Sequence, residues 1–462
     1  MELCVLVGNS FHRRPAVGRQ GTRDAELRRE SLSAKNLRYL RETKRRFSFV
    51  VLSVLVGNIF YHKGTKQCRF SVPLLHSVTL SGLNPYLCPM QKIGILGGGQ
   101  LGRMLLQVAA NYPVETYVLE NDAECPAAHL CQHFTKGDIK DFDAVYNFGK
   151  GLDAITIEIE NVNIDALEKL EAEGVKVFPK PSVLRTIKNK ILQKEYYKQH
   201  GVPTSDFIIT QDKAELAKQQ AFLPAVHKIG EGGYDGKGVQ LLKTADDLSK
   251  GFDAPSVLEK MVPIQKEIAQ MIAVNEKGET ALYPPVEMLF DPELNLLDYQ
   301  LCPADISTQT LYKVEAIALA VVRNFKSPGI FAVELFIDQN GDVLVNETAP
   351  RVHNSGHHTI EAHYSSQFDM LWRVMLNYPL GNTAAILPSI MVNIIGDEGH
   401  SGDVKYEGLD EVLKVENAFV HLYGKKQTKP GRKMGHVTIL SKEKQDLLYQ
   451  SNKIKRTLKS RS

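Results

Sequence analysis

From Met90 onward, apolar runs of strand length alternate with stretches of helical periodicity. Four short apolar runs have the length and composition of buried strands: 91–96, 116–119, 153–159 and 175–178. A helix is predicted over 100–110, directly after the first run. Because strands that alternate with helices are typical of a parallel sheet, the pattern predicts a parallel α/β unit from residue 90 to residue 187.

A second series of elements is predicted after this unit. One helix should begin near Ser182 and end before His200, where Gly201 and Pro203 stop it. The remaining expectations are strands at 224–228 and 256–260, helices at 313–325 and 363–377, and a small mixed segment at 389–440.

A β-hairpin is predicted around Asn340-Gly341, where apolar residues alternate on both sides of the pair. Asn-Gly favours a two-residue type I′ turn, which needs positive φ at both positions. With this turn, Glu334 lies directly opposite Glu347. Like charges in that arrangement repel each other, and oxygen ligands of this kind suit Mg²⁺. The alternative is a solvated hairpin face on which the two side chains diverge.

An irregular segment follows the second hairpin strand and contains Arg351, His353 and Asn354. Loops at strand ends commonly carry function. This segment therefore favours the metal-site interpretation of the two carboxylates.

Residues 97–102 fit the pattern G-x-G-x-x-G between a strand and a helix, with Glu120 at the end of the next apolar run. This combination is typical of dinucleotide-binding proteins, so a nicotinamide-dependent oxidoreductase is one hypothesis. The N–H groups at such a helix start also bind other phosphates and anions. The motif alone therefore leaves the ligand open.

A glycine-rich loop at 230–238 follows a predicted strand that ends in Lys228. Five glycines in nine residues cannot pack a core and lose much entropy on ordering. Together with Lys228 and Lys237, such a loop is suited to a polyphosphate. The spacing excludes a Walker loop, and a surface turn is the alternative.

Lys and Arg cluster at 425–433, around Pro430-Gly431. A basic cluster often binds nucleic acid, but this one is short and has no interleaved aromatic residues. A pocket for one phosphate monoester suits it better, and a solvated basic loop is the alternative.

The composition, 43% hydrophobic and 24% charged over 462 residues, is that of a soluble globular protein of two or three domains. The six cysteines form no C-x-x-C pair. Neither a zinc site nor a disulfide framework is indicated, which fits a reducing cytoplasm.

Residues 1–89 differ from the rest of the chain, with 15 Lys and Arg against 5 Asp and Glu, whereas the remainder has 41 against 48. The apolar stretch at 47–61 is too short for a confident membrane span. The scarcity of acidic residues is compatible with a transit peptide. We expect instead that Met90 is the natural start and that residues 1–89 are disordered or not native, and we assign them no function.

Four motifs occur in order: GGGQLGRM at 97–104, GGYDGKG at 232–238, NETAPRVHNSGH at 346–357 and KPGRKMGH at 429–436. Together they resemble the N5-carboxyaminoimidazole ribonucleotide synthetase family of ATP-grasp ligases, from Met90 to about Leu440. The resemblance implies a fold of α/β and α+β class. The implied division is an extension (1–89), a Rossmann-like substrate domain (90–187), an ATP-grasp lid subdomain (188–255), a catalytic subdomain (256–388), a small C-terminal domain (389–445) and a tail (446–462).

The resemblance also implies roles for individual residues. Mg²⁺ would be held by Glu334 and Glu347. ATP would be bound by Lys190, Lys228, Gly233, Tyr234, Asp235, Gly236, Lys237, Gly238, Val239, Glu259, Lys260, Met261, Val262, Glu267, Asn346 and Glu347. Of these, Lys190 and Lys228 would contact the phosphates under a lid formed by residues 233–239, residues 259–262 would bind adenine, and Glu267 would contact the ribose hydroxyls. Substrate would be bound by Gly99, Gln100, Leu101, Glu158, Arg351, His353, Lys425, Arg432 and Lys433, with Glu160 an open alternative to Glu158. Catalytic roles would fall to Arg351, Asn354 and Lys228.

The implied reaction is the ATP-dependent carboxylation of aminoimidazole ribotide with bicarbonate, through carboxyphosphate, in purine biosynthesis. The implied enzyme is a cytoplasmic homodimer that needs ATP and Mg²⁺ and binds neither nucleic acid nor membrane. Three alternatives stay open: another ATP-grasp carboxylase or formate-dependent transformylase, an NAD-dependent oxidoreductase, and a non-enzymatic phosphate or RNA binder.

Overall fold

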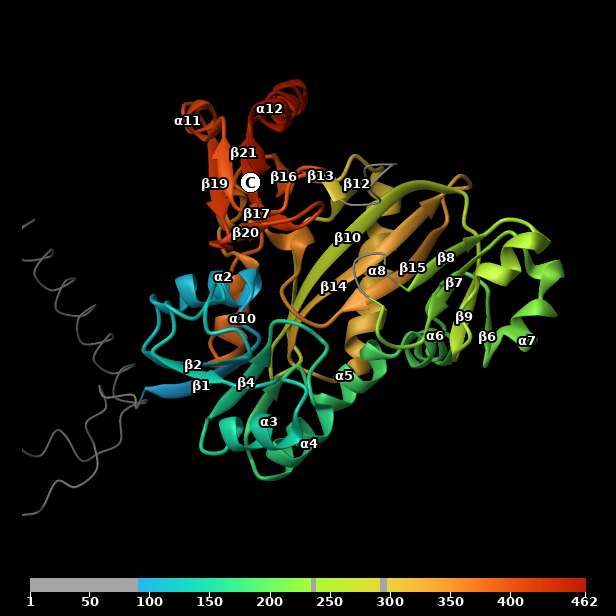
Figure 1. Cartoon of the computed structure of the whole chain (residues 1–462), viewed down its shortest axis with the longest axis horizontal. Coiled ribbons are helices and arrows are strands. Elements are labelled where there is room, and N and C mark those ends of the chain that lie inside the picture. The colour runs from blue at the N-terminus through green and yellow to red at the C-terminus, as the bar shows by residue number, and fades with distance from the viewer. Residues whose placement is uncertain (1–89, 234–237, 291–296) are drawn as a thin grey trace, which may run out of the picture. The chain divides into compact units, whose positions relative to one another are not determined.

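The structure, a computed structural model, describes residues 90–233, 238–290 and 297–462. The predicted extension at 1–89 and residues 234–237 of the predicted lid lie outside these ranges. Three larger sheets, of five, four and nine strands, organise the described part (Figure 1).

The five-stranded sheet is parallel throughout and has the order β3-β2-β1-β4-β5. Its strands are β1 (Gln91–Leu96), β2 (Val114–Glu120), β3 (His133–Lys136), β4 (Ala154–Ile157) and β5 (Lys176–Phe178), and its helices are α2 (Gln100–Ala109), α3 (Phe142–Gly149) and α4 (Ile164–Ala172). The predicted parallel α/β unit is confirmed. Strand β3 was not predicted, because no residue in it is buried and it shows no apolar alternation.

The single helix predicted from Ser182 to His200 is wrong, since two helices meet at Asn189. They are α5 (Pro181–Lys188) and α6 (Lys190–Gln199). The Asn189 side chain accepts hydrogen bonds from the backbone N–H groups of Ile191 and Leu192, at 2.9 and 3.1 Å. Asparagine is a favoured N-cap residue, so it starts the second helix in a new direction.

The four-stranded sheet is antiparallel, with the order β6-β9-β7-β8. Its strands are β6 (Phe207–Thr210), β7 (Ala225–Ile229), β8 (Val239–Leu242) and β9 (Ser256–Lys260), accompanied by the short helices α7 (Lys213–Ala217), η1 (Gln220–Phe222) and η2 (Ala245–Lys250).

The nine-stranded sheet has the order β15-β14-β10-β12-β13-β16-β21-β19, with β11 paired to β10. Its strands are β10 (Ile264–Val274), β11 (Thr280–Leu282), β12 (Val286–Phe290), β13 (Leu297–Cys302), β14 (Gly329–Asp338), β15 (Val343–Ala349), β16 (Ser389–Ile395), β19 (Ala418–Leu422) and β21 (Lys433–Leu440). Because β16 pairs with both β13 and β21, the sheet continues across the boundary predicted at residue 389.

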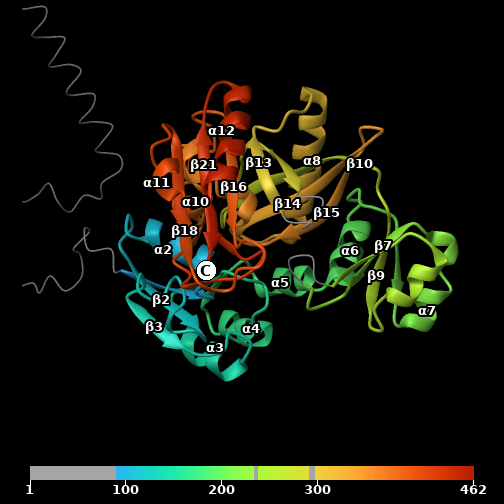
Figure 2. The ribbon, with the colours of Figure 1, turned by 45° about the horizontal axis from the view of Figure 1, so that its top comes forward.

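Two longer helices accompany this sheet, at the places predicted. They are α8 (Thr308–Phe325) and α10 (Gln367–Met375). Each begins directly after a serine, Ser307 or Ser366, whose side chain caps the first turn. Helix α8 packs on β10, β14 and β15. Helix α10 packs against α2, which accompanies the five-stranded sheet (Figure 2). The Trp372 indole N–H donates to the Leu105 carbonyl at 2.8 Å.

The remaining elements lie outside the three larger sheets. These are η3 (Asn354–Gly356), α9 (Thr359–Ala362), β17 (Gly402–Asp403), β18 (Lys405–Glu407), α11 (Leu409–Val412), β20 (Gln427–Thr428), α12 (Lys444–Thr457) and β22 (Lys459–Arg461). Among them, β17 pairs with β20 and β18 with β22 in two small sheets. Residues 446–462 were predicted to be a tail, but Leu447 and Ile454 are buried in a hydrophobic cluster and β22 pairs with β18. Among the helices of the described ranges, none has the length and hydropathy to cross a bilayer.

The predicted hairpin forms between β14 and β15, but its turn differs from the predicted one. Asp338 pairs with Asp342, so the loop has three residues, and only Gly341 within it has positive φ. This shifts the register by one residue near the turn. A β-bulge at Asn346 then shifts it back, and Glu334 pairs with Glu347 as predicted.

Candidate active site

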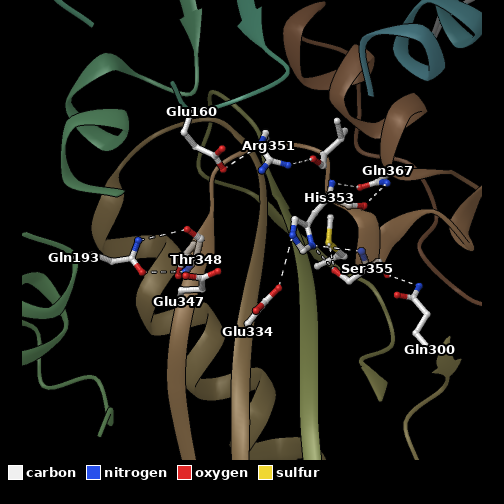
Figure 3. Close-up of polar contacts among 12 residues, drawn as sticks. Glu160, Gln193, Gln300, Glu334, Glu347, Thr348, Arg351, His353, Ser355 and Gln367 are labelled. Carbon is white, nitrogen blue, oxygen red and sulfur yellow. Dashed lines mark hydrogen bonds and ion pairs between the residues drawn. The ribbon is translucent and has the colours of Figure 1, made fainter. Parts of the chain in front are cut away.

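Glu334 and Glu347 lie on neighbouring strands and face each other (Figure 3). Val343 and Val345 of β15 are buried in the hydrophobic core under α8. Without the bulge at Asn346, strict alternation would place Glu347 on that same core face. The bulge therefore turns Glu347 to the face of Glu334.

The two carboxylates differ in their electrostatic environment. Burial, together with Glu347 and Glu267, raises the pKa of Glu334. The Lys190 ammonium, 2.5 Å from Glu347, lowers the pKa of that carboxyl. An added divalent cation would relieve the repulsion at Glu334, and the Glu347 side chain, 41% exposed, is open to such a ligand.

Two lysines reach the bulge from different elements. Lys190, at the start of α6, bonds Glu347, and Lys228, on β7, donates to Asn346 Oδ1 at 2.9 Å. Helix α6 is fixed to β15 because Gln193 Oε1 accepts the Thr348 backbone N–H at 3.2 Å (Figure 3). The structure thus brings together both predicted phosphate-binding lysines and both predicted metal ligands.

Lys194 is a member of this cluster that the sequence did not indicate. Its ammonium lies 2.8 Å from one Glu259 oxygen, and Lys228 lies 3.0 Å from the other. Burial lowers the pKa of Lys194 to about 8, while the two lysines hold the pKa of Glu259 low despite its burial. The spacing of Lys190 and Lys194, one helical turn apart, was the available signal.

The predicted adenine-binding segment lies where the chain passes from the four-stranded to the nine-stranded sheet. Both carboxylate oxygens of Glu259 pair with lysines, Lys228 and Lys194, so this side chain is not available to adenine. The Lys260 ammonium donates to the carbonyls of Phe222 and Leu223, and Met261 is 42% exposed. Backbone groups of 260–262 therefore stay the candidates for adenine.

Glu267 lies on β10, two residues from Ala269, which pairs with Glu334. Residues two apart in a strand share a face, so Glu267 lies on the face of the carboxylate pair. Burial raises the pKa of Glu267 to about 7.

The predicted lid is the loop between β7 and β8. Lys228 pairs with Val239 at its base, and the Ile229 N–H donates to the Gly238 carbonyl at 2.9 Å. Gly232 and Gly238 have φ of 85° and 83°, which favour glycine. Of the seven predicted lid residues, Tyr234, Asp235, Gly236 and Lys237 lie outside the described residues.

The segment after β15 begins beside the carboxylates. His353 Nε2 lies 3.7 Å from Glu334, and the Gln367 amide oxygen accepts the His353 backbone N–H (Figure 3). Arg351 forms an ion pair with Glu160 at 2.9 Å. Asn354 Oδ1 is buried and has no hydrogen-bond partner among the described residues, so it is available to a ligand.

The predicted anion site at the start of α2 holds a carboxylate of the protein itself. Glu158 accepts hydrogen bonds from the N–H groups of Gly99 and Leu101, at 2.5 and 3.1 Å, and burial raises its pKa. Glu120 accepts the Gly98 N–H at 3.0 Å. Phosphate binding by residues 99–101 stays a prediction. A phosphate there would compete with Glu158 for the backbone N–H groups of Gly99 and Leu101. Both Glu158 and Glu160 point inward, toward different partners.

The predicted basic loop lies against the five-stranded-sheet unit. Lys426 forms an ion pair with Glu124, and Tyr423 shares a hydrophobic cluster with Leu101 of α2. Lys425 donates to the Lys433 carbonyl at 2.7 Å, and Arg432 to the Gln427 carbonyl at 2.7 Å. The basic loop and the unit that carries the glycine-rich motif at 97–102, although far apart in sequence, therefore border each other.

Three protein families match consecutive parts of the chain. Residues 90–188 match the ribonucleotide synthetase preATP-grasp domain, 195–368 the ATP-grasp domain, and 389–450 the phosphoribosylaminoimidazole carboxylase C-terminal domain. An N5-carboxyaminoimidazole ribonucleotide synthase from Brucella melitensis is 35% identical over 360 residues, which cover 76% of this chain and 97% of that protein. The chain belongs to the N5-carboxyaminoimidazole ribonucleotide synthase family.

Solved structures of the N5-carboxyaminoimidazole ribonucleotide synthase family have the same fold. The Thermotoga maritima synthetase matches with a TM-score of 0.75 and 38% identity, over 81% of this chain and 100% of that one. An Aspergillus clavatus synthase in complex with ADP and aminoimidazole ribonucleotide matches with a TM-score of 0.71 and 32% identity, over 78% and 96%. The chain spans 67% of the length of a phosphoribosylaminoimidazole carboxylase from Ogataea methanolica and 64% of a chloroplastic one from Vigna aconitifolia.

Membership in the N5-carboxyaminoimidazole ribonucleotide synthase family confirms several predictions from the sequence. These are the family, the ATP-grasp fold with its preATP-grasp and C-terminal domains, and an ATP-dependent ligase of purine biosynthesis. The oxidoreductase hypothesis is wrong, since Glu120 accepts a hydrogen bond from Gly98 of the glycine-rich motif and 81% of the chain matches an N5-carboxyaminoimidazole ribonucleotide synthetase.

Proposed function

We propose that this chain carboxylates aminoimidazole ribotide with bicarbonate, forming N5-carboxyaminoimidazole ribotide, ADP and phosphate. The observation that carries this proposal is one continuous cluster. In it, the Lys190 and Lys228 cations contact Glu347 and Asn346, and Glu334 adjoins His353 of the anion-binding segment.

ATP lies, in this proposal, between the four-stranded sheet and strands β10, β14 and β15. Lys190 and Lys228 contact its phosphates under the lid, with Asn346 beside them. The backbone of 260–262 receives adenine, and Glu267 accepts hydrogen bonds from the ribose hydroxyls. Lys228 is preoriented for this role because Glu259 and Asn346 already fix its ammonium.

The carboxylate pair fits Mg²⁺. Its donor atoms are all oxygen and it comprises two carboxylates. Burial beside Glu347 and Glu267 raises the pKa of Glu334, and a bound cation would offset this effect. Glu334 and Glu347 would hold the ion, which would neutralise charge on the phosphates.

Bicarbonate is a poor electrophile, so it must be activated first. Its oxygen attacks the γ-phosphorus and ADP leaves, which gives carboxyphosphate. The ribotide amine then attacks the carboxyl carbon, phosphate leaves and the amine loses a proton. Arg351, fixed by Glu160, and the N–H donors of the Asn354 side-chain amide hold the anionic intermediate, and the closed lid excludes water.

The ribotide occupies the border between the basic loop and the start of α2. Lys425, Arg432 and Lys433 bind its phosphate. The helix start at Gln100 joins them once the Glu158 carboxylate gives up the N–H groups of Gly99 and Leu101 and turns to the substrate. The ion pair of Lys426 with Glu124 and the hydrophobic cluster that includes both Tyr423 and Leu101 support this placement, because they join the two segments.

Release of ADP and phosphate by the full chain tests the reaction. We expect turnover only when ATP, bicarbonate and aminoimidazole ribotide are all present. Turnover with formate in place of bicarbonate would instead identify a transformylase, and NADH binding without ribotide-dependent ADP would contradict the ligase. The homodimer, the cytoplasmic location and the domain boundaries stay predictions.

A further inference from the structure

A second cluster of ligand-type side chains lies outside the proposed active site. It consists of Cys302 at the end of β13 and of His358 and His363, which flank α9. One potential ligand atom from each residue lies within 4.8 Å of the others, and Cys302 Sγ is 3.9 Å from His363 Nε2. All three side chains are buried, with at most 3% of their surface exposed.

The polar atoms of this cluster are poorly satisfied. Among the described residues, His358 Nε2 and His363 Nδ1 have no hydrogen-bond partner. Ser389 pairs with Cys302 across β13 and β16, so both side chains lie on one face of the sheet, and Ser389 Oγ is also buried without a partner. Buried polar atoms without partners are rare in proteins, so a concentration of them points to a missing ligand.

The chemistry of these residues selects the ligand. One thiolate and two imidazoles form a donor set for thiophilic ions, and the hard ion Mg²⁺ prefers oxygen. We propose that Cys302, His358 and His363 bind a thiophilic metal ion, Zn²⁺ or Cu⁺, with Ser389 beside it.

Binding of the ion has two consequences for the protein. The Cys302 thiol gives its proton to solvent. The donor atoms move toward the ion until each metal–ligand bond is about 2.0–2.3 Å long. The Gln300 side-chain amide bonds both the Ser355 carbonyl and His358 Nδ1, at 2.8 and 2.9 Å. The ion would therefore stiffen the segment that carries His353 and Asn354.

Cobalt binding to the full, metal-free chain tests this proposal. Co²⁺ bound to a thiolate gives a near-ultraviolet charge-transfer band, whereas Co²⁺ at the carboxylate pair does not. We expect this band in the wild type, its loss in Cys302→Ser and in His363→Gln, and its retention in Cys131→Ser. Cys131 is the matched control, since it lies outside the cluster and bonds the Ala128 carbonyl.

Titration of the cobalt-loaded chain with Zn²⁺ measures the stoichiometry, because Zn²⁺ binds this donor set more tightly than Co²⁺ and should displace it at one equivalent per chain. Metal analysis of the purified chain should show one equivalent more in the wild type than in Cys302→Ser. A wild-type chain without the thiolate band would overturn the proposal. So would a band of equal strength in Cys302→Ser, which would assign it to another cysteine.

Discussion

At the scale of single residues, the two facing carboxylates are not equivalent. Glu347 has a cation partner, Lys190, whereas Glu334 is buried against two other carboxyl groups, Glu347 and Glu267. Before a metal ion binds, Glu347 therefore contributes to folding and Glu334 opposes it. Substitutions at the two positions should therefore have opposite effects on folding stability but the same effect on activity.

Replacing each carboxylate by its amide tests this expectation. Glu334→Gln should raise the melting temperature without Mg²⁺, because it removes repulsion, and Glu347→Gln should lower it, because Lys190 loses its partner. Both variants should lose about 100-fold or more in kcat/KM for Mg²⁺-ATP, the scale of a lost electrostatic contact in a transition state. Thermal melts and steady-state kinetics measure the two effects, and full activity in both variants would contradict the assignment.

Glu267 predicts a pH dependence of stability. Its pKa is about 7 in the folded chain against an ordinary 4.5, so between these values the folded state holds a proton that the unfolded state has lost. Its contribution to stability is therefore present below pH 4.5 and falls as the pH rises to 7. Glu267→Gln cannot ionise, and its melting temperature should fall less than that of the wild type between pH 5 and 8. Parallel curves would show that Glu267 titrates normally.

At the scale of elements, the site depends on irregularities within regular structure. The three-residue loop and the bulge at Asn346 each shift the hairpin register by one residue, in opposite directions. The sequence predicted the pairing of Glu334 with Glu347 correctly although it missed both shifts. A hydrophobic pattern shows which face of a strand is buried. It does not reveal the bulge at Asn346, because a polar residue after Val345 also fits normal alternation.

The lid can be tested with two glycines of similar backbone conformation. At Gly238, an added Cβ would lie 2.6 Å from Ile229 Cγ2 and 2.9 Å from Gly233 Cα, whereas at Gly232 it would meet nothing within 4 Å. Both substitutions by alanine carry the strain of positive φ. Gly238→Ala should raise the KM for ATP more than Gly232→Ala, with small changes in melting temperature. Equal KM values in the two variants would show that the base of the lid tolerates displacement.

At the scale of the whole molecule, the proposed site combines residues from all three matched domains. Arg351 reaches Glu160, Trp372 reaches Leu105 and Lys426 reaches Glu124, so each part is anchored to another. The motifs predicted these parts and their order. They could not predict Lys194, whose partner Glu259 is distant in sequence, or the cluster of Cys302 with His358 and His363, which only the folded β13 and α9 bring together.

The division of labour between domains predicts separable kinetic effects. Arg432→Ala, in the basic loop, should raise the KM for the ribotide several-fold and leave the KM for ATP unchanged, because the proposed ATP site lies between the four-stranded sheet and strands β10, β14 and β15. Arg323→Ala, a similar change on the exposed side of α8, is the matched control and should alter neither. Equal increases in both KM values for Arg432→Ala would contradict a phosphate pocket in this loop.

The central claim is that ATP phosphorylates bicarbonate at the Glu334–Glu347 pair. Oxygen transfer tests it most directly, with bicarbonate labelled in all oxygens by ¹⁸O, in a single turnover faster than exchange with water. The account predicts that the released phosphate carries one ¹⁸O atom, since the attacking oxygen stays on phosphorus when carboxyphosphate reacts. Phosphate without label, released together with carboxylated ribotide, would contradict it.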